Sequence, residues 1–314
     1  MLARLQQVTT IGLVLAAIAW AAYFVRIGAP AWAAAGALLV LFGYAVFLGV
    51  EFVLLRFANR DDPAPPATVR QLAKAWWGEV LTAPRVFCWR QPFRSNAEPD
   101  SLDHATGRRG VVLVHGFVCN RGLWNPMMAR LRARGVPFVA VNLEPVFGSI
   151  DHYADIIEAA VQRLESAGGL PPVMVAHSMG GLAVRAWMAA HAGDERVHRV
   201  ITIGTPHRGT FLGRFGHTHN ARQMRIGSDW QRELAAREPP HRYDRFTCFY
   251  GHCDNIVFPA ITATLPGADN RHIAGVAHVH MVHQQEVFDE VLRWLGPATD
   301  AASRRLSADR VSLQ

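Results

Sequence analysis

The sequence predicts an α/β protein: a mostly parallel sheet with helices on both faces, preceded by two membrane-spanning helices. Two observations lead to this class. Between Gly110 and Leu295, short β-branched apolar runs alternate with helical stretches, as in parallel sheets with crossover helices. Residues 11–50 contain one charged side chain, Arg26, so the chain begins with a strongly apolar region. The predicted strands are almost wholly apolar, which burial on both faces of a sheet requires.

The apolar region divides into two runs, Thr9–Val25 and Ile27–Val50. A helix needs roughly 20 apolar residues to cross a bilayer. We therefore predict helices over about 5–25 and 30–55, joined by a tight turn, as a membrane anchor within residues 1–60. A buried hairpin in a soluble core is one alternative, although neither run has a polar face. A cleaved signal peptide ending near Ala19-Trp20-Ala21 is the other.

Charged residues around the two runs predict the orientation of the anchor. Arg4 precedes the first run and only Arg26 lies between the runs, whereas basic residues gather after the second: Arg56, Arg60, Arg70 and Lys74. Since basic loops stay on the cytoplasmic side, both ends of the anchor and the α/β domain after it are expected in the cytoplasm.

Composition excludes several classes of protein. Of 314 residues, 50% are hydrophobic and 18% are charged, which excludes a disordered chain. The net charge of +7 is too small for the dense basic stripe of a nucleic-acid groove, so we expect no nucleic-acid partner. The four cysteines show neither paired metal-ligand spacing nor a disulfide-rich pattern.

Residues 61–107 are expected to connect the anchor to the α/β domain. Asp61–Thr68 is polar and proline-rich, as linkers are. Val69–Leu81 is a candidate interfacial helix, in which Trp76 and Trp77 either lie at the membrane surface or pack on the next domain. Residues 84–107 give no clear pattern.

The α/β domain is expected over 108–297, followed by a mobile tail over 298–314. Its predicted strands are Val111–His115, Phe138–Asn142, Val173–Ala176, Arg199–Ile203, Arg245–Tyr250 and His272–Gly275. Its predicted helices are Leu123–Arg134, Ile150–Ala167, Gly180–Ala192 and Gln284–Leu295. In such sheets, chemistry gathers at the carboxyl ends of the strands.

The strongest chemical signal is a serine between a strand and a helix, in Ala176-His177-Ser178-Met179-Gly180-Gly181. Small residues two before and two after Ser178 let strand and helix approach closely, as a sharp turn around a nucleophile requires. A chance match to this short string is the alternative. The strand before it and the helix after it favour Ser178 as the nucleophile.

Acyl transfer also needs two backbone N–H groups aimed at the oxyanion. The N–H of Met179 is one candidate, and the N–H of Phe117, in the loop after the first predicted strand, is the other. Gly116 lets that loop come close to the serine. His115 is more consistent with orienting the loop than with catalysis.

A nucleophilic serine needs a base and an acid that orients the base. Asp254 follows a strand end, and His278 follows the last strand, which gives the order Ser178, Asp254, His278. His280 and His283 remain alternative bases, and the three histidines together could form a metal site, although no cysteine or carboxylate cluster supports one. Alternative acids are Asp244 and Asp269.

Two further segments surround this site. The turn Gly204-Thr205-Pro206-His207-Arg208-Gly209 follows the next strand, and we interpret it as structural. His207 is not favoured as the base, because it precedes the acid in the chain whereas the base should follow it. Residues 207–245 form a long insertion that is either a cap or lid over apolar acyl chains or an ordinary surface excursion.

The motifs from Gly110 to Leu295 resemble those of the bacterial lipase/esterase branch of the α/β-hydrolase superfamily. The resemblance rests on His115-Gly116-Phe117 with Trp124, the serine motif, the Gly204–Gly209 turn, Gly227-Ser228, Asp254 and His278. It implies an α/β-hydrolase fold, a serine nucleophile, hydrolysis of carboxylic esters and no organic cofactor. It also implies the triad roles of Ser178, Asp254 and His278 and the oxyanion roles of Phe117 and Met179.

The sequence therefore predicts a serine hydrolase in the bacterial inner membrane that cleaves lipidic or acyl esters through an acyl-enzyme. The partners expected are the bilayer and an ester or lipid substrate; no metal or cofactor is expected. Two alternatives stay open: an acyltransferase or thioesterase with the same triad, and a membrane-anchored interaction module without catalysis. The sequence does not indicate the oligomeric state.

Overall fold

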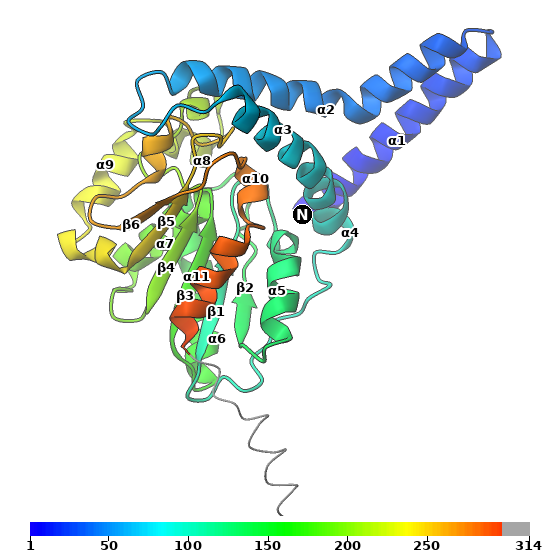
Figure 1. The fold of residues 1–314 in the computed structure, drawn as a ribbon. Helices are drawn as coiled ribbons and strands as arrows, with labels where there is room; N and C mark the ends of the chain where they lie inside the picture. The colour runs from blue at the N-terminus through cyan, green and yellow to red at the C-terminus, as the bar shows by residue number, and fades with distance from the viewer. Residues whose placement is uncertain (297–314) are drawn as a thin grey trace, which may run out of the picture.

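The computed structural model describes residues 1–296, in which one parallel sheet is sandwiched between helices below a long helical hairpin (Figure 1). The six strands follow the order β2-β1-β3-β4-β5-β6, and all neighbours are parallel. Their bounds are β1 Arg109–Val114, β2 Phe138–Ala140, β3 Leu170–His177, β4 Arg199–Ile203, β5 Phe246–Tyr250 and β6 Asp269–His272. The predicted α/β class is confirmed.

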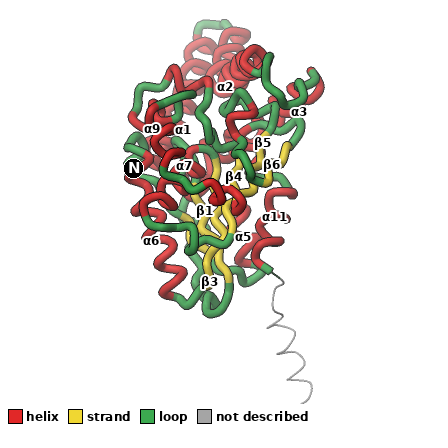
Figure 2. Tube along the Cα trace, turned by 90° about the vertical axis from the view of Figure 1, so that its left-hand side faces the viewer, coloured by secondary structure: helices red, strands yellow, loops and turns green. Residues whose placement is uncertain are grey.

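Helices cover both faces of the sheet, because side chains alternate between the faces along each strand. On β1, Val112 and Val114 pack against α6 (Tyr153–Ser166) and α7 (Met179–Ala190). Val111 and Leu113 point to the other face, where α5 (Asn125–Arg132) and α11 (Gln285–Leu295) lie. Figure 2 shows the strands between α6 and α11 in the perpendicular view.

Shorter elements complete the α/β domain. The remaining helices are α8 His219–Gln223, α9 Asp229–Ala236 and α10 His278–Met281. The 3₁₀ turns are η2 Arg121–Trp124, η3 Ile150–His152, η4 Phe211–Phe215, η5 Pro240–Arg245 and η6 Ala260–Ala263. Residues 207–245, the insertion identified in the sequence, thus contain η4, α8, α9 and η5.

The two apolar runs form helices α1 (Leu2–Arg26) and α2 (Pro30–Ala58), which leave the domain together as a hairpin (Figure 1). Both are long and apolar enough to cross a membrane. Only 6% and 17% of their most apolar windows are buried, which disagrees with a hairpin inside a soluble core. The base of α1 touches the domain, where Gln6 donates to Gln91 and Gln7 donates to the Pro92 carbonyl.

The segment after the hairpin is more structured than a linker. Helix α3 (Val69–Pro84) begins with a capping box between Thr68 and Gln71 and continues through the π-helical turn η1 (Arg85–Arg90) into α4 (Gln91–Phe93). Ala75 on α3 and Val86 on η1 are fully buried against the domain. Trp76 donates to the Ala45 carbonyl of α2, whereas Trp77 is 56% exposed, so the two tryptophans differ in environment.

Several predicted boundaries were wrong, most clearly at the sheet edge. The last strand was predicted over His272–Gly275, but β6 occupies Asp269–His272, where polar residues form an exposed edge. Apolarity misses such a strand because edge strands are not buried on both faces. Strand β2 ends at Ala140 rather than Asn142. The predicted tail over 298–314 lies outside the described residues.

Candidate active site

Ser178 occupies a sharp turn between β3 and α7, at the carboxyl edge of the sheet. Its backbone has φ 55° and ψ −130°, a strained conformation for a residue with a side chain. A hydrogen bond of 2.9 Å from the Ser178 N–H to the Ile203 carbonyl holds the turn. A Cβ atom at Gly180 would lie 2.5 Å from the His115 carbonyl oxygen, so this position requires glycine.

The loop after β1 comes directly against Ser178. A Cβ atom at Gly116 would lie 2.7 Å from the Ser178 Cβ, which shows how closely the loop approaches. Within residues 1–296, the Phe117 and Met179 N–H groups donate no hydrogen bond to a protein atom. The structure therefore leaves both predicted oxyanion donors unoccupied beside the serine.

His115 holds this loop in place. Its Nε2 accepts a hydrogen bond of 3.0 Å from the Leu143 N–H, so its Nδ1 carries the proton and donates to the Gly116 carbonyl at 2.9 Å. Burial lowers the pKa of His115 to about 4. A neutral, fully bonded imidazole fits the orienting role.

Asp254 and His278 form a buried pair. The His278 Nδ1 lies 2.9 Å from the Asp254 Oδ2. The Asp254 Oδ1 accepts from the Ile256 and Val257 N–H groups at 2.9 and 2.8 Å, which fixes the carboxylate. A Cβ atom at Gly204 would lie 2.7 Å from the Asp254 Oδ2 and 3.0 Å from the His278 Nδ1, so the end of β4 packs tightly on the pair.

His278 and Ser178 line the same cavity. Among the described residues no hydrogen bond joins the Ser178 Oγ to the His278 ring; in free enzymes this contact is often long. Burial lowers the pKa of His278, but the carboxylates of Asp254, Glu79 and Glu51 outweigh burial and raise it overall. The neighbouring His177, whose ring centroid lies 4.5 Å away, has a pKa well below the usual range because of burial.

The alternative bases and acids lie elsewhere. His283 contacts Arg90 at 3.2 Å, and Asp269 pairs with Arg271 at 2.6 Å on the edge strand. His280, His283, Asp244 and Asp269 do not line the cavity that contains Ser178. Within residues 1–296, no group of three or more potential metal ligands converges, so the three histidines of this loop do not meet. His207 is buried and contacts Thr202 at 3.0 Å.

Two carboxylates that the sequence analysis did not assign to the site reach the His278 loop from the N-terminal helices. Glu79 on α3 accepts hydrogen bonds from the Val279 and His280 N–H groups at 3.1 and 3.0 Å. It therefore caps α10, and burial raises its pKa. Glu51 on α2 acts through Asn255: it accepts from the Asn255 Nδ2 at 2.6 Å, and the Asn255 Oδ1 accepts from the His278 N–H at 3.2 Å.

A signal for Glu51 was present in the sequence. It is the only acidic residue in the run Pro30–Ala58, and an ionisable residue inside an apolar helix is a candidate functional residue. Glu79 gave no comparable signal, because a single glutamate on an amphipathic helix is usually solvated.

The cavity beside Ser178 has a volume of about 710 Å³. One wall carries Ser178, His278 and Phe117, and the opposite wall comes from the N-terminal helices. Those helices contribute Leu13, Leu39, Val40, Leu41, Gly43, Tyr44, Phe47, Leu48, Glu51, Glu79, Ala83, Pro84, Phe87 and Cys88. Among the described residues, the insertion over 207–245 lines none of it, so α1, α2, α3 and η1 occupy the place expected of a cap.

Comparison with known proteins agrees with this geometry. The Alpha/beta hydrolase family model matches residues 111–308. No curated protein sequence matches the chain. The mature form of Bacillus licheniformis lipase BlEst2 superposes with a TM-score of 0.53 at 18% identity, covering 60% of this chain and 92% of the lipase.

The propeptide form of the same lipase gives a TM-score of 0.54 at 19% identity. It covers 62% of this chain, which spans about half (52%) of that longer form. At this identity the likeness concerns the fold. The family match, which covers more than half of the chain, together with the parallel sheet and the serine turn, shows that this chain belongs to the alpha/beta hydrolase family.

Proposed function

We propose that this chain is a membrane-bound serine hydrolase that cleaves carboxylic esters with long acyl chains. One observation carries the proposal: Ser178, on its strained turn, opens into a largely apolar cavity together with a histidine whose other nitrogen is bonded to a buried aspartate. A nucleophile, a base and an orienting acid are the groups that acyl transfer needs.

In the proposed mechanism the Ser178 Oγ attacks the ester carbonyl carbon while the His278 Nε2 takes the hydroxyl proton. Asp254 holds the Nδ1–H side of the ring and stabilises the imidazolium. The Phe117 and Met179 N–H groups stabilise the oxyanion. The intermediate expels the alcohol, which receives the proton from His278. Water, deprotonated by His278, then attacks the acyl-enzyme, and the carboxylic acid leaves as Ser178 regains its proton.

The shape and lining of the cavity support a lipidic substrate. A volume of about 710 Å³ accommodates a long acyl chain, and the wall opposite Ser178 consists mainly of leucine, valine and aromatic side chains. Because α1 and α2, which contribute many of these side chains, are apolar enough to enter a bilayer, an acyl chain would reach Ser178 without crossing water.

We further propose that the hairpin crosses the bacterial inner membrane with the catalytic domain on the cytoplasmic side. Basic residues flank both domain-facing ends of the hairpin, and Arg26 alone lies at its far turn. Labelling of cysteines introduced at Ala29 and at Ala64 in intact cells, in a chain whose exposed Cys88 is replaced by serine, tests this orientation. Only the Ala29→Cys variant should react with an impermeant thiol reagent; exclusive reaction of Ala64→Cys would contradict it.

The enzymatic proposal is tested with a fluorophosphonate probe on detergent-solubilised protein, followed by peptide mapping. We expect one adduct, on Ser178, and hydrolysis of p-nitrophenyl esters that is lost in Ser178→Ala at an unchanged circular dichroism spectrum. An adduct without ester turnover would instead support an acyltransferase or a thioesterase. Adding an acceptor alcohol to the assay would reveal the acyltransferase, and supplying a thioester as substrate would reveal the thioesterase. No adduct on folded protein would support a non-catalytic module.

A further inference from the structure

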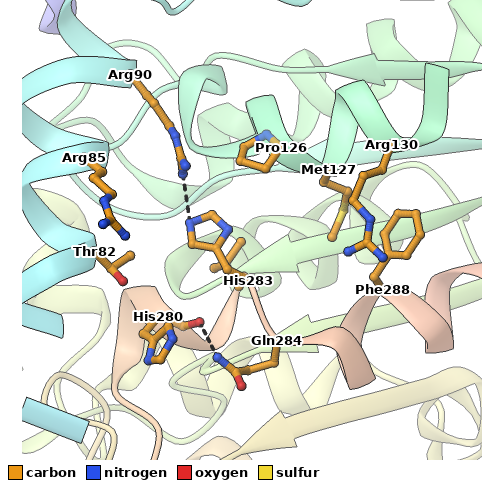
Figure 3. A pocket seen from close by; sticks show the side chains of 11 residues that line it. Thr82, Arg85, Arg90, Pro126, Met127, Arg130, His280, His283, Gln284 and Phe288 are labelled. Carbon is orange, nitrogen blue, oxygen red and sulfur yellow. Dashed lines mark hydrogen bonds between the residues drawn. The ribbon is translucent and has the colours of Figure 1, made fainter. Parts of the chain in front are cut away.

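A second pocket lies on the opposite side of the α3–η1 segment from the cavity beside Ser178. Its volume is about 240 Å³, and its walls come from α3, η1, α5, α10, α11 and the residues between α10 and α11. Figure 3 shows Arg85 and Arg90 on one wall and Arg130 over the Phe288 ring on the other, with His283 between them. Residues that line this pocket do not line the cavity of Ser178.

The pocket is strongly positive. Three guanidinium groups line it, and no aspartate or glutamate of the described chain does. Arg85 makes no ion pair or side-chain hydrogen bond to any residue within 1–296. Arg130 lies with its guanidinium carbon 3.4 Å from the centre of the Phe288 ring and donates to the neutral Gln285 amide at 2.9 Å.

His283 does not offset this charge. The Arg90 Nη1 can only donate, so the His283 Nε2, 3.2 Å away, accepts and the imidazole is neutral. Burial, followed by the charges of Arg90 and His280, lowers the pKa of His283 to about 3, so the ring adds no charge near neutral pH. Burial and the nearby Arg85 also lower the pKa of Arg90.

Several other buried or partly buried arginines of the described chain have carboxylate partners. Arg185 pairs with Glu238 and Arg242 pairs with Asp194, each at 2.6 Å, and Arg196 pairs with Glu158 at 2.9 Å. Arg90 and Arg130 are also partly buried but pair with no carboxylate of residues 1–296. An anionic ligand in the pocket would supply the missing countercharge.

The arrangement favours a phosphate group over a single carboxylate. Guanidinium groups approach from opposite walls, and the three or more oxygens of a phosphate can accept from several of them at once. The pocket also lies near the base of the hairpin, since α1 bonds through Gln6 and Gln7 to the residues that directly follow Arg90. Lipid headgroups would lie at this level around an inserted hairpin.

We propose that the pocket formed by Arg85, Arg90 and Arg130 binds a phosphate group, carried either by an anionic phospholipid headgroup or by a soluble phosphate. The wall of the pocket includes His280 and His283, which follow His278 on the same short stretch of chain. A bound phosphate therefore braces the segment that carries the proposed base. Binding itself does not depend on Ser178.

The test uses the full chain in an uncharged detergent, titrated by calorimetry with inorganic phosphate, dihexanoyl phosphatidic acid and dihexanoyl phosphatidylcholine. We compare the wild type with Arg85→Gln, the double variant Arg85→Gln/Arg90→Gln, and Arg70→Gln, an exposed arginine at the other end of α3. Arg85→Gln removes no hydrogen bond of the described structure, so it should fold even if the double variant does not.

We expect Arg85→Gln to weaken binding about tenfold, as loss of one charge-assisted contact does, and Arg70→Gln to leave it unchanged. Binding of phosphatidic acid alone would identify a lipid headgroup; comparable binding of inorganic phosphate would identify a soluble phosphate. The proposal is overturned if the wild type binds no probe, or if Arg85→Gln and Arg70→Gln behave alike. Ser178→Ala should bind as the wild type does, so failure of the esterase proposal is detected separately.

Discussion

Glu51 of helix α2 accepts a hydrogen bond of 2.6 Å from the Asn255 side chain, which lies 204 residues later in the chain. Asn255 in turn accepts from the backbone N–H of His278. Helix α2, which is long and apolar enough to span a membrane, is thus hydrogen-bonded to Asn255, and Asn255 is hydrogen-bonded to the proposed base, His278. This connection joins the hairpin to the candidate active site and leads to the first prediction.

Glu51→Ala should lower kcat for a p-nitrophenyl ester by about tenfold to a hundredfold. The substitution leaves the buried Asn255 amide without an acceptor, which costs on the order of 1–3 kcal/mol and loosens the His278 backbone. Glu51→Gln offers an oxygen in the same place and should restore most of the activity. If both variants keep wild-type kcat, Glu51 does not position the base.

Glu79→Gln should shift the acid limb of the kcat/KM profile to lower pH. Neutral His278 is the active base, so activity is lost as pH falls through the pKa of His278. The Glu79 carboxylate contributes to raising that pKa, and its removal therefore lowers it. The two profiles should converge at low pH, where Glu79 itself is protonated.

The pH profile is measured with an ester whose hydrolysis needs no membrane. Glu286→Gln, at an exposed position, serves as the control for an equal change in net charge. An acid limb at the same pH in wild type, Glu79→Gln and Glu286→Gln would contradict the assigned electrostatic coupling.

Asp254→Asn should lower kcat by about 10⁴ with little change in KM. The amide that replaces the Oδ2 atom cannot accept from the His278 Nδ1–H, so the ring is held in the wrong tautomer. Burst-phase kinetics should show that acylation becomes slow. Asp244→Asn, the change at an alternative acid outside the cavity, should leave kcat within twofold; a larger loss there than at Asp254 would reverse the assignment.

Gly204→Ala should remove nearly all activity. Its φ of +55° strains any side chain, and the added Cβ would meet both the Asp254 carboxylate and the His278 ring. Gly107→Ala is the matched control, because Gly107 has a φ of +67° with open space around the position of a Cβ. Equal activity losses in the two variants would mean that backbone strain, and not contact with the pair, is responsible.

The sheet could be predicted from the sequence because its central strands are buried on both faces. Strands β3 and β4 contain short apolar runs, and helices such as α6 and α11 follow the 3.6-residue period. Strand β6 is an exception, because it lies at the sheet edge and is not buried on both faces. Its residues Asp269 and Arg271 are hydrogen-bonded to each other and partly exposed, so no apolar run marks the strand.

The candidate site was predictable where one local motif specifies the geometry. Ser178 is such a case, since small residues around a strand-to-helix turn leave few other structures. The contacts of Glu79 and Asn255 depend on how α3 and α2 pack against a loop about 200 residues away. No spacing rule encodes such a distance, so these residues became visible only in the folded chain.

Removal of the first 107 residues would leave Ser178, Asp254, His278 and all six strands in the chain. It would also strip the far wall from the substrate cavity and expose the Val279 and His280 amides that Glu79 now satisfies. The hairpin and α3 are therefore more than a tether, because they line the cavity and hold the loop that carries the proposed base. The structural unit around the candidate site extends from the hairpin to the last described helix and begins well before residue 111, where the family match starts.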